Sequence, residues 1–264
     1  PMGQGRRLGN GEEGSFEWRL RKELVEALQI YLYRYLVKQY KALRKELPID
    51  SSKYGELYKW QLIKDCKGKG VEYIAKRLCK ENLIDVSRDA SVIKYMLAND
   101  KEEYINILSR LFNSTSSLHE RLQGFKQSMA MALPAKLNGK KIMGKANDER
   151  MASAILTCHN PESYTFYKND VYVRLCEYLG IEDKYAGNCL EHFLVLLKPL
   201  QQIIKQDEEL HEIVADSLKD HEENSLLLAQ DVLWEMLVCY PRRLDYIYSL
   251  VWKPRYWFVG FNFG

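Results

Sequence analysis

The chain has 264 residues, of which 46% are hydrophobic, 28% are charged and 12% are aromatic, and its formal net charge is +3. This balance excludes an intrinsically disordered chain, and 15 glycines with 7 prolines exclude a collagen-like chain. No run of about 18 apolar residues is present, so the sequence predicts no membrane span. The six cysteines stand singly, mostly within apolar helical patterns, which favours reduced thiols in a cytoplasmic protein.

The charge is unevenly distributed along the chain. Residues 1–150 contain 29 of the 39 Lys and Arg residues and 19 of the 36 Asp and Glu residues, which gives a net charge of +10. Residues 151–264 contain the remaining 10 Lys and Arg residues and the remaining 17 Asp and Glu residues, which gives a net charge of −7. The first part of the chain is therefore able to present a basic face to a polyanion. The alternative is a solvated basic surface that the acidic part neutralises.

The first predicted element is a long amphipathic helix over residues 16–47, preceded at 1–15 by a flexible leader or a cloning scar. Neither Gly nor Pro interrupts this stretch, and Pro48 ends it. A helix of this length can brace a domain or pair with another copy. Its apolar residues recur at helical spacing: Leu20, Leu24, Ala27, Leu28, Tyr31, Tyr35, Leu36 and Leu43.

Shorter helices are predicted over 55–66, 71–80, 89–97 and 102–112. A further helix runs to about residue 133, with Ser116 or Ser117 as its cap and Glu120 placed to complete a capping box. Together with the first helix they form a basic helical subdomain at 16–135. The Lys- and Gly-containing stretch at 136–146 is predicted to be a loop between subdomains.

An acidic helical subdomain is predicted at 147–245. Its helices span 149–158, 171–179, 189–206, 208–218 and 225–240, with Asn147 or Asp148 and Asn169 or Asp170 as candidate caps for the first two and Gly180 ending the second. Residues 246–264 are predicted to be a linker and the first strand of a truncated following domain, because 255–264 are rich in aromatic and β-branched residues. The predicted fold class is all-α: a multi-helical domain with a long N-terminal helix, ending in the start of a β-strand.

Three patterns that suggest catalysis or metal binding are incomplete. Gly139–Lys145 has the GxxxxGK spacing of a phosphate-binding loop, but Ala146 replaces the Ser or Thr that holds Mg²⁺. Asp170 with Glu182 and Lys184 resembles a nuclease triad only in composition, because such acids lie on adjacent strands. The five histidines show no metal-ligand spacing. We therefore predict no catalytic residue, no metal and no cofactor.

Basic residues interleaved with aromatic residues are the remaining candidate site, because such surfaces bind nucleic acid by phosphate contact and stacking. The candidate nucleic-acid contacts are four loop lysines and three cations of the first helix: Lys136, Lys140, Lys141, Lys145, Arg34, Lys38 and Lys41. The tyrosines beside them, such as Tyr33 and Tyr40, are alternatively core residues with their hydroxyls at the surface.

Three short segments carry a family resemblance. They are Asn147–Gly180, with the pattern LT…PE.Y..YK, then Leu227–Trp234, then Tyr256–Gly260. Together they resemble the helical module that precedes the AAA+ GTPase motor in bacterial McrB-type methylation-dependent restriction proteins. The resemblance implies a DNA-targeting region with a motor or nuclease subunit as partner, and it carries over no catalytic residue.

Two functions follow as predictions. The first is a non-catalytic DNA-binding or target-recognition region of a restriction or defence protein, in the cytoplasm and able to oligomerise. The alternative is a helical protein–protein interaction or scaffold domain that docks a motor or partner subunit without touching DNA. A continuous basic face would favour the first function.

Overall fold

The computed structural model describes residues 16–50, 56–84, 89–133, 136–137, 140–141, 149–181 and 188–244. This part of the chain is built of helices, so the all-α prediction is confirmed, as is the long N-terminal helix α1 (Phe16–Glu46). The predicted terminal strand at 255–264 lies outside the described residues.

The other α-helices lie close to their predicted positions. Their bounds are α2 (Leu57–Cys66), α3 (Val71–Leu78), α4 (Asp89–Asn99), α5 (Lys101–Phe112), α6 (Leu118–Ala132), α7 (Glu149–His159), α8 (Asn169–Leu179), α9 (Cys189–Lys205), α10 (Glu208–Leu218) and α11 (Ser225–Trp234).

Local capping chemistry explains several of these bounds. The Ser117 side chain accepts from the Glu120 backbone N–H, and the Glu120 carboxylate accepts from the Ser117 backbone N–H, which completes the predicted capping box. Gly180 ends α8 in the left-handed region at φ 68°, as predicted from its lack of a Cβ. The predicted cap of α8 is wrong, because Lys168 holds the N-cap position and Asn169 is already helical. Asn147 and Asp148 lie outside the described residues.

Two segments differ from their predicted secondary structure. The stretch predicted as a plain loop contains two short antiparallel strands, β1 (Lys136–Leu137) and β2 (Lys140–Lys141). The sequence between them is Asn138-Gly139, a strong hairpin signal that the loop prediction overlooked. The helix predicted over 225–240 changes character after Trp234, where a π-helix (Glu235–Cys239) continues it and a 3₁₀-helix (Pro241–Leu244) follows.

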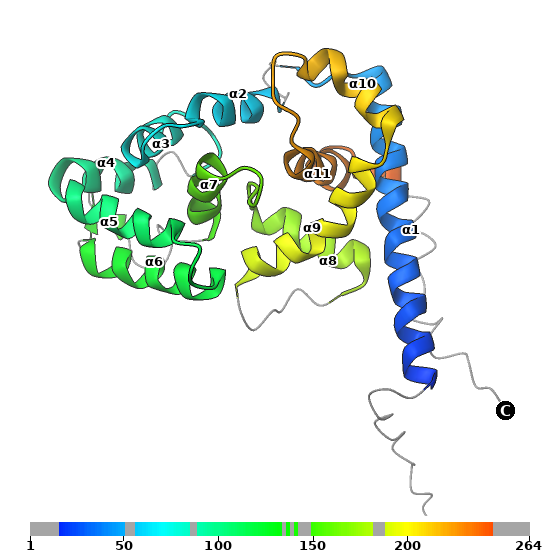
Figure 1. Cartoon of the computed structure of the whole chain (residues 1–264), viewed down its shortest axis with the longest axis horizontal. Coiled ribbons are helices and arrows are strands. Elements are labelled where there is room, and N and C mark those ends of the chain that lie inside the picture. The colour runs from blue at the N-terminus through cyan, green and yellow to red at the C-terminus, as the bar shows by residue number, and fades with distance from the viewer. Residues whose placement is uncertain are drawn as a thin grey trace, which may run out of the picture.

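The helices pack in two groups that meet at α7 and α9 (Figure 1). Helices α2 to α7 form one group, with α4, α5 and α6 farthest from α1. Helix α1 joins the other group, packing along α8, α9, α10 and α11. This packing cuts across the predicted division at 136–146, and the division into two subdomains stays a prediction.

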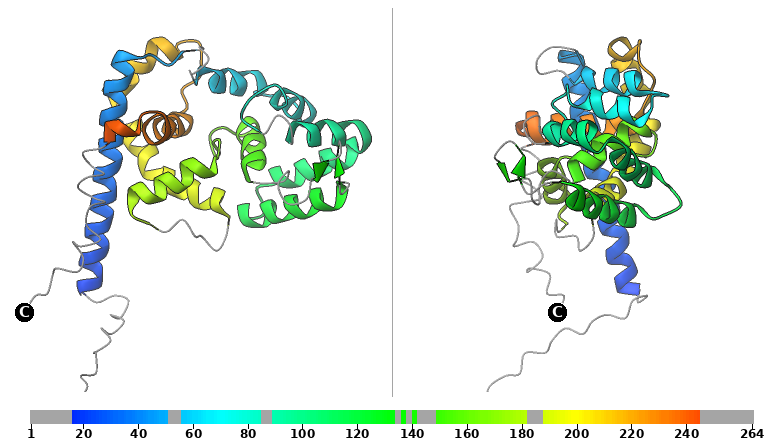
Figure 2. Two further views of the ribbon diagram at one scale, coloured as in Figure 1. Left: turned by 180° about the vertical axis from the view of Figure 1, so that it is seen from behind. Right: turned by 90° about the vertical axis from the view of Figure 1, so that its left-hand side faces the viewer.

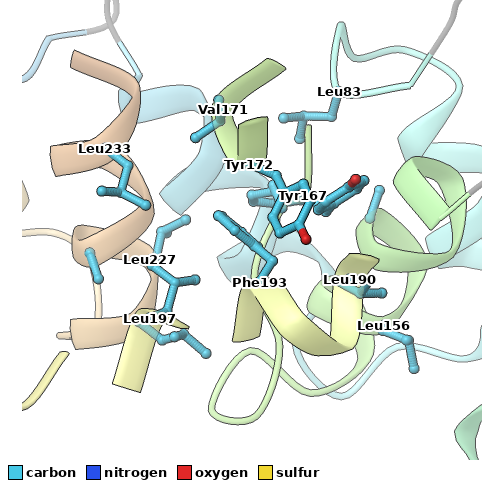
Figure 3. Packing of buried hydrophobic residues seen from close by; sticks show 14 of the residues in the cluster. Leu83, Leu156, Tyr167, Val171, Tyr172, Leu190, Phe193, Leu197, Leu227 and Leu233 are labelled. Carbon is cyan, nitrogen blue, oxygen red and sulfur yellow. The ribbon is translucent and has the colours of Figure 1, made fainter. Parts of the chain in front are cut away.

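An aromatic cluster fills the region where the two groups meet (Figure 3). The rings of Tyr167 and Phe193 meet edge to face with centroids 5.6 Å apart, and Tyr172 packs at 6.0 Å from Tyr167. Leucines of α7, α9 and α11 surround these rings, among them Leu156 and Leu227. Because edge-to-face aromatic packing is directional, this cluster fixes how α8 and α9 lie against their neighbours.

Candidate functional site

The N-terminal half of α1 carries several of the large apolar side chains that are exposed in the described part of the chain. Every side chain from residue 23 to residue 28 is exposed, and Leu24, Leu28 and Tyr31 are 69%, 46% and 56% exposed. In both views this half of the helix projects beyond the other helices (Figures 1 and 2). We call Leu24, Val25, Leu28 and Tyr31 the projecting apolar face.

The apolar residues predicted for α1 divide between two surfaces, because Leu24, Leu28 and Tyr31 are exposed whereas Leu36 and Leu43 are buried. Burial begins at Leu32 and Tyr33, which were not in the predicted apolar set. The spacing rule identified helical apolar residues correctly, but it could not reveal that no described helix reaches the first turns of α1.

Buried tyrosines anchor the second half of α1. The Tyr33 hydroxyl donates to the Leu196 carbonyl at 2.6 Å, and the Tyr178 hydroxyl donates to the Leu32 carbonyl at 3.0 Å. Helix α9 contains Pro199, which has no N–H to donate to the Val195 carbonyl. The next carbonyl along this helix, that of Leu196, accepts the hydrogen bond from Tyr33. One prediction for Tyr33 was a ring in the core with its hydroxyl at the surface; the ring is buried, but its hydroxyl is hydrogen-bonded to the backbone of α9.

Two pairs of polar side chains join α1 to α11 and the π-helix. Tyr40 and Arg44 are four residues apart on α1, and Asp231 and Glu235 are four residues apart opposite them. The Tyr40 hydroxyl donates to Asp231 Oδ2 at 2.6 Å, and Arg44 Nη2 lies 3.3 Å from Glu235 Oε2. Residues four apart share one face of a helix, so this double contact fixes the register of α1 against α11. We call these four residues the α1 anchor.

A buried lysine extends the α1 anchor toward α2. Lys59 is fully buried, forms an ion pair with Glu56, and donates to Gln230 Oε1 at 2.8 Å. Its Nζ also lies 5.9 Å from the centre of the Trp234 ring, and that of Lys168 lies 3.7 Å from the same ring. Burial, together with a smaller effect of the nearby charge of Lys59, lowers the pKa of Lys168 to about 8.

The carboxyl groups of the α1 anchor are shifted toward their neutral forms. Burial raises the pKa of Glu235 to about 7, and the neighbouring Asp231 adds to the shift. Burial likewise raises the pKa of Asp231, against the opposing effect of Lys59. Sequence analysis missed these residues, although the signal was present: Asp231 and Glu235 are acids inside the apolar run 226–238.

The three predicted DNA-contacting cations of α1 differ in their surroundings. Arg34 and Lys38 are exposed, and no ion pair involving either is found within the described residues. Lys41 lies 2.9 Å from Asp207 and 2.7 Å from Glu209, and Lys45 contacts the same Glu209 at 2.7 Å. Hydrogen bonds from these lysines lower the pKa of Glu209 to about 2. The first turn of α10 therefore neutralises this part of the basic helix.

The predicted loop lysines fall partly outside the described residues. Lys136, Lys140 and Lys141 lie on β1 and β2, and Lys136 is paired in register with Lys141. Lys145 lies outside the described residues. Of the seven predicted contacts, the described structure places only Arg34 and Lys38 as exposed neighbours on one helix.

A cavity of about 650 Å³ opens where three helices end. The ends of α2 and α7 and the segment from α10 to α11 surround it. Trp60, Ile63, Cys158 and Leu227 contribute apolar surface, while histidines and charged residues complete the lining. Its volume lies in the range typical of small-molecule sites, roughly 300–1,000 Å³. Sequence analysis did not find this cavity, because its walls come from segments about 60 to 160 residues apart.

Two searches of the described residues bear on other kinds of site. None of the described helices has both the length and the apolar character that crossing a membrane requires. Within the same residues, no group of three or more His, Cys, Asp or Glu side chains is placed to hold a metal ion. All six cysteines are free thiols.

Comparison of this chain with protein-family models, with curated proteins and with solved structures gave no match. The resemblance to McrB-type proteins stays a prediction.

Proposed function

We propose that this chain is a helical scaffold domain that assembles with a second copy of itself through the projecting apolar face of α1. The observation that carries this proposal is the exposure of Leu24, Leu28 and Tyr31 on a helix whose other half is firmly anchored. Soluble proteins seldom leave several large apolar side chains together in water unless they form an interaction surface.

The sequence of the projecting half suits pairing with an identical helix. Leu24, Leu28 and Tyr31 follow one another at spacings of four and three, which is the repeat of a coiled-coil seam. Residues 16–31 contain three basic and three acidic residues, so two copies of this segment do not repel each other through net charge. The same neutrality gives this segment no electrostatic attraction for DNA.

The test is the molar mass of the full chain by size-exclusion chromatography with light scattering. We expect an assembly that dissociates on dilution, and we expect Leu24→Glu with Leu28→Glu to give the monomer mass, because a charge in the seam leaves a buried carboxylate unpaired. Both side chains are exposed, so the thermal unfolding midpoint of the monomer should change little.

Met131→Glu is the matched control. Met131 is 83% exposed on α6, which belongs to the helices farthest from α1, and its substitution should leave the assembly intact. A wild-type chain that stays monomeric at high concentration would contradict self-assembly. The scaffold would then dock a different chain, such as the predicted motor or nuclease subunit.

DNA binding is the second candidate, favoured by the exposed and unpaired cations Arg34 and Lys38 within the described residues. It predicts that Arg34→Gln with Lys38→Gln weakens binding to all duplexes about equally, because phosphate contacts carry no base information. The slope of log affinity against log salt should fall by about 2, one counterion for each lost contact.

Fluorescence anisotropy of a labelled duplex at several salt concentrations measures this. Lys41→Gln is the matched control, since Lys41 is held by Asp207 and Glu209 and should not contribute to the slope. If the wild-type chain and the double variant show equal slopes, α1 does not bind DNA.

A further inference from the structure

Lys168 places an amine on a flat aromatic surface at the N-cap of α8. Its Nζ lies 3.7 Å from the centre of the Trp234 ring, and within the described residues it has neither a hydrogen-bond acceptor nor an ion-pair partner. Lys168 is partly exposed, and its Nζ is not among the unpartnered side-chain nitrogens that are closed to solvent. The amine is therefore accessible to a small reagent, and no carboxylate among the described residues holds it in the protonated form.

The surroundings of Lys168 favour the neutral amine. Burial is the main reason that its pKa is lowered to about 8 from an ordinary value of 10.5. The charges of Lys59 and Arg150 act in the same direction, whereas those of Glu56 and Asp170 oppose it. About a fifth of the molecules therefore carry a neutral Lys168 at pH 7.4, against about one in a thousand for an ordinary lysine. Only the neutral amine is a nucleophile.

An arginine of α7 lies beside this amine and has a donor to spare. Ser153 Oγ donates to the Arg150 carbonyl at 2.8 Å and accepts from the Tyr167 backbone N–H at 3.0 Å, so it joins the first turn of α7 to the residue before Lys168. Arg150 Nε and Nη2 donate to two backbone carbonyls in the turn that follows α3. Arg150 Nη1 has no acceptor among the described residues. The guanidinium is thus held in place while one of its nitrogens remains free for an anion.

A nucleophilic amine beside a guanidinium suits one class of reagent. Acyl phosphates combine an electrophilic carbonyl carbon with an anionic phosphate leaving group. Arginine binds phosphate oxygens through its N–H donors, and a cation placed at the leaving group stabilises the charge that develops there.

We propose that Lys168 is a site of covalent modification by small acyl phosphates, with Arg150 binding their phosphate group. The lone pair of the neutral Nζ attacks the carbonyl carbon, a C–N bond forms, and the C–O bond to phosphate breaks. The phosphate leaves with that electron pair, and one proton of the nitrogen passes through solvent to it. The product is a neutral, planar amide, which suits the face of the Trp234 ring. This site is separate from the projecting apolar face.

The test uses acetyl phosphate as the probe, with the full chain at pH 7.5. Peptide mass spectrometry gives the initial rate of acetylation at each lysine. We expect Lys168 to react about tenfold faster than Lys38, because its larger neutral fraction outweighs the weaker nucleophilicity of an amine of lower pKa. Lys38 is the reference because it is exposed and has no ion pair within the described residues. The rate at Lys168 should level off above about pH 9, where its amine is mostly neutral.

Acetic anhydride, which releases acetate and no phosphate, separates the role of the amine from that of Arg150. Arg150→Gln should slow the reaction of Lys168 with acetyl phosphate about three- to tenfold more than its reaction with acetic anhydride, the difference expected for one lost hydrogen bond. Arg110→Gln is the matched control, since Arg110 is exposed on α5 and pairs with Glu103 of the same helix, and it should leave both rates unchanged.

The proposal is overturned if wild-type Lys168 reacts with acetyl phosphate no faster than Lys38, a result that requires no variant. It is also overturned if the folded Arg150→Gln variant loses no more rate with acetyl phosphate than with acetic anhydride.

Discussion

At the scale of single residues, Glu235 makes the anchoring of α1 sensitive to pH. Its pKa is raised to about 7 in the folded chain by burial and by Asp231, against an ordinary value of 4.5. A raised pKa means that the folded state favours the protonated carboxyl. The stability it contributes is therefore fully present below about pH 4.5 and is lost as the pH rises through about 7.

We expect Glu235→Gln to remove this dependence. The difference in unfolding free energy between the variant and the wild-type chain should shift in favour of the variant by about 1–2 kcal/mol from acidic to mildly alkaline pH. Urea denaturation across that range measures it, and taking the difference cancels the opposite contribution of histidines such as His221. With Glu212→Gln, an exposed carboxylate of α10, the difference should stay constant. A constant difference for Glu235→Gln as well would mean that the pKa of Glu235 is the same in the folded and the unfolded chain.

At the scale of elements, α1 has two halves with different energetic roles. Up to residue 28 its described side chains touch little, whereas from Leu32 they form part of the core. A chain that begins at residue 29 should therefore have a free energy of unfolding within about 0.5 kcal/mol of that of the full chain, measured where the full chain is monomeric.

A chain that begins at residue 38 loses Leu32, Tyr33, Leu36 and Val37, each at most 2% exposed. Since truncating one such residue costs about 2–5 kcal/mol, this shorter chain should not fold cooperatively. Denaturant titrations followed by circular dichroism compare the two. If the chain beginning at residue 29 is already unstable, the first half of α1 makes stabilising contacts that its exposure does not reveal.

At the scale of the whole molecule, the helices were predictable and their partners were not. The spacing of apolar residues, a capping residue such as Ser117 and a helix-ending residue such as Gly180 act within a few residues of the chain. They can therefore be recognised in the local sequence. The contact between Tyr40 and Asp231 spans 191 residues, and no local pattern specifies it. Of the candidate sites, the apolar residues of α1 were identified from their spacing, but the spacing did not specify which of them the other helices cover. The α1 anchor and the cavity were missed because each is assembled from distant segments.

The separation of Tyr40 and Asp231 along the chain also means that α1 is synthesised long before the residues that it packs against. Helix α1 leaves the ribosome before α9 to α11, and Asp231 follows Tyr40 only after 191 further residues. At about 5–20 residues per second, this is a wait of about 10–40 s. For most of this time, until α9 (Cys189–Lys205) is made, the face of α1 that will be buried has none of its partners in α9 to α11. The nascent helix then exposes both its projecting and its anchoring apolar residues, and transiently exposed hydrophobic surface of this kind is prone to aggregation.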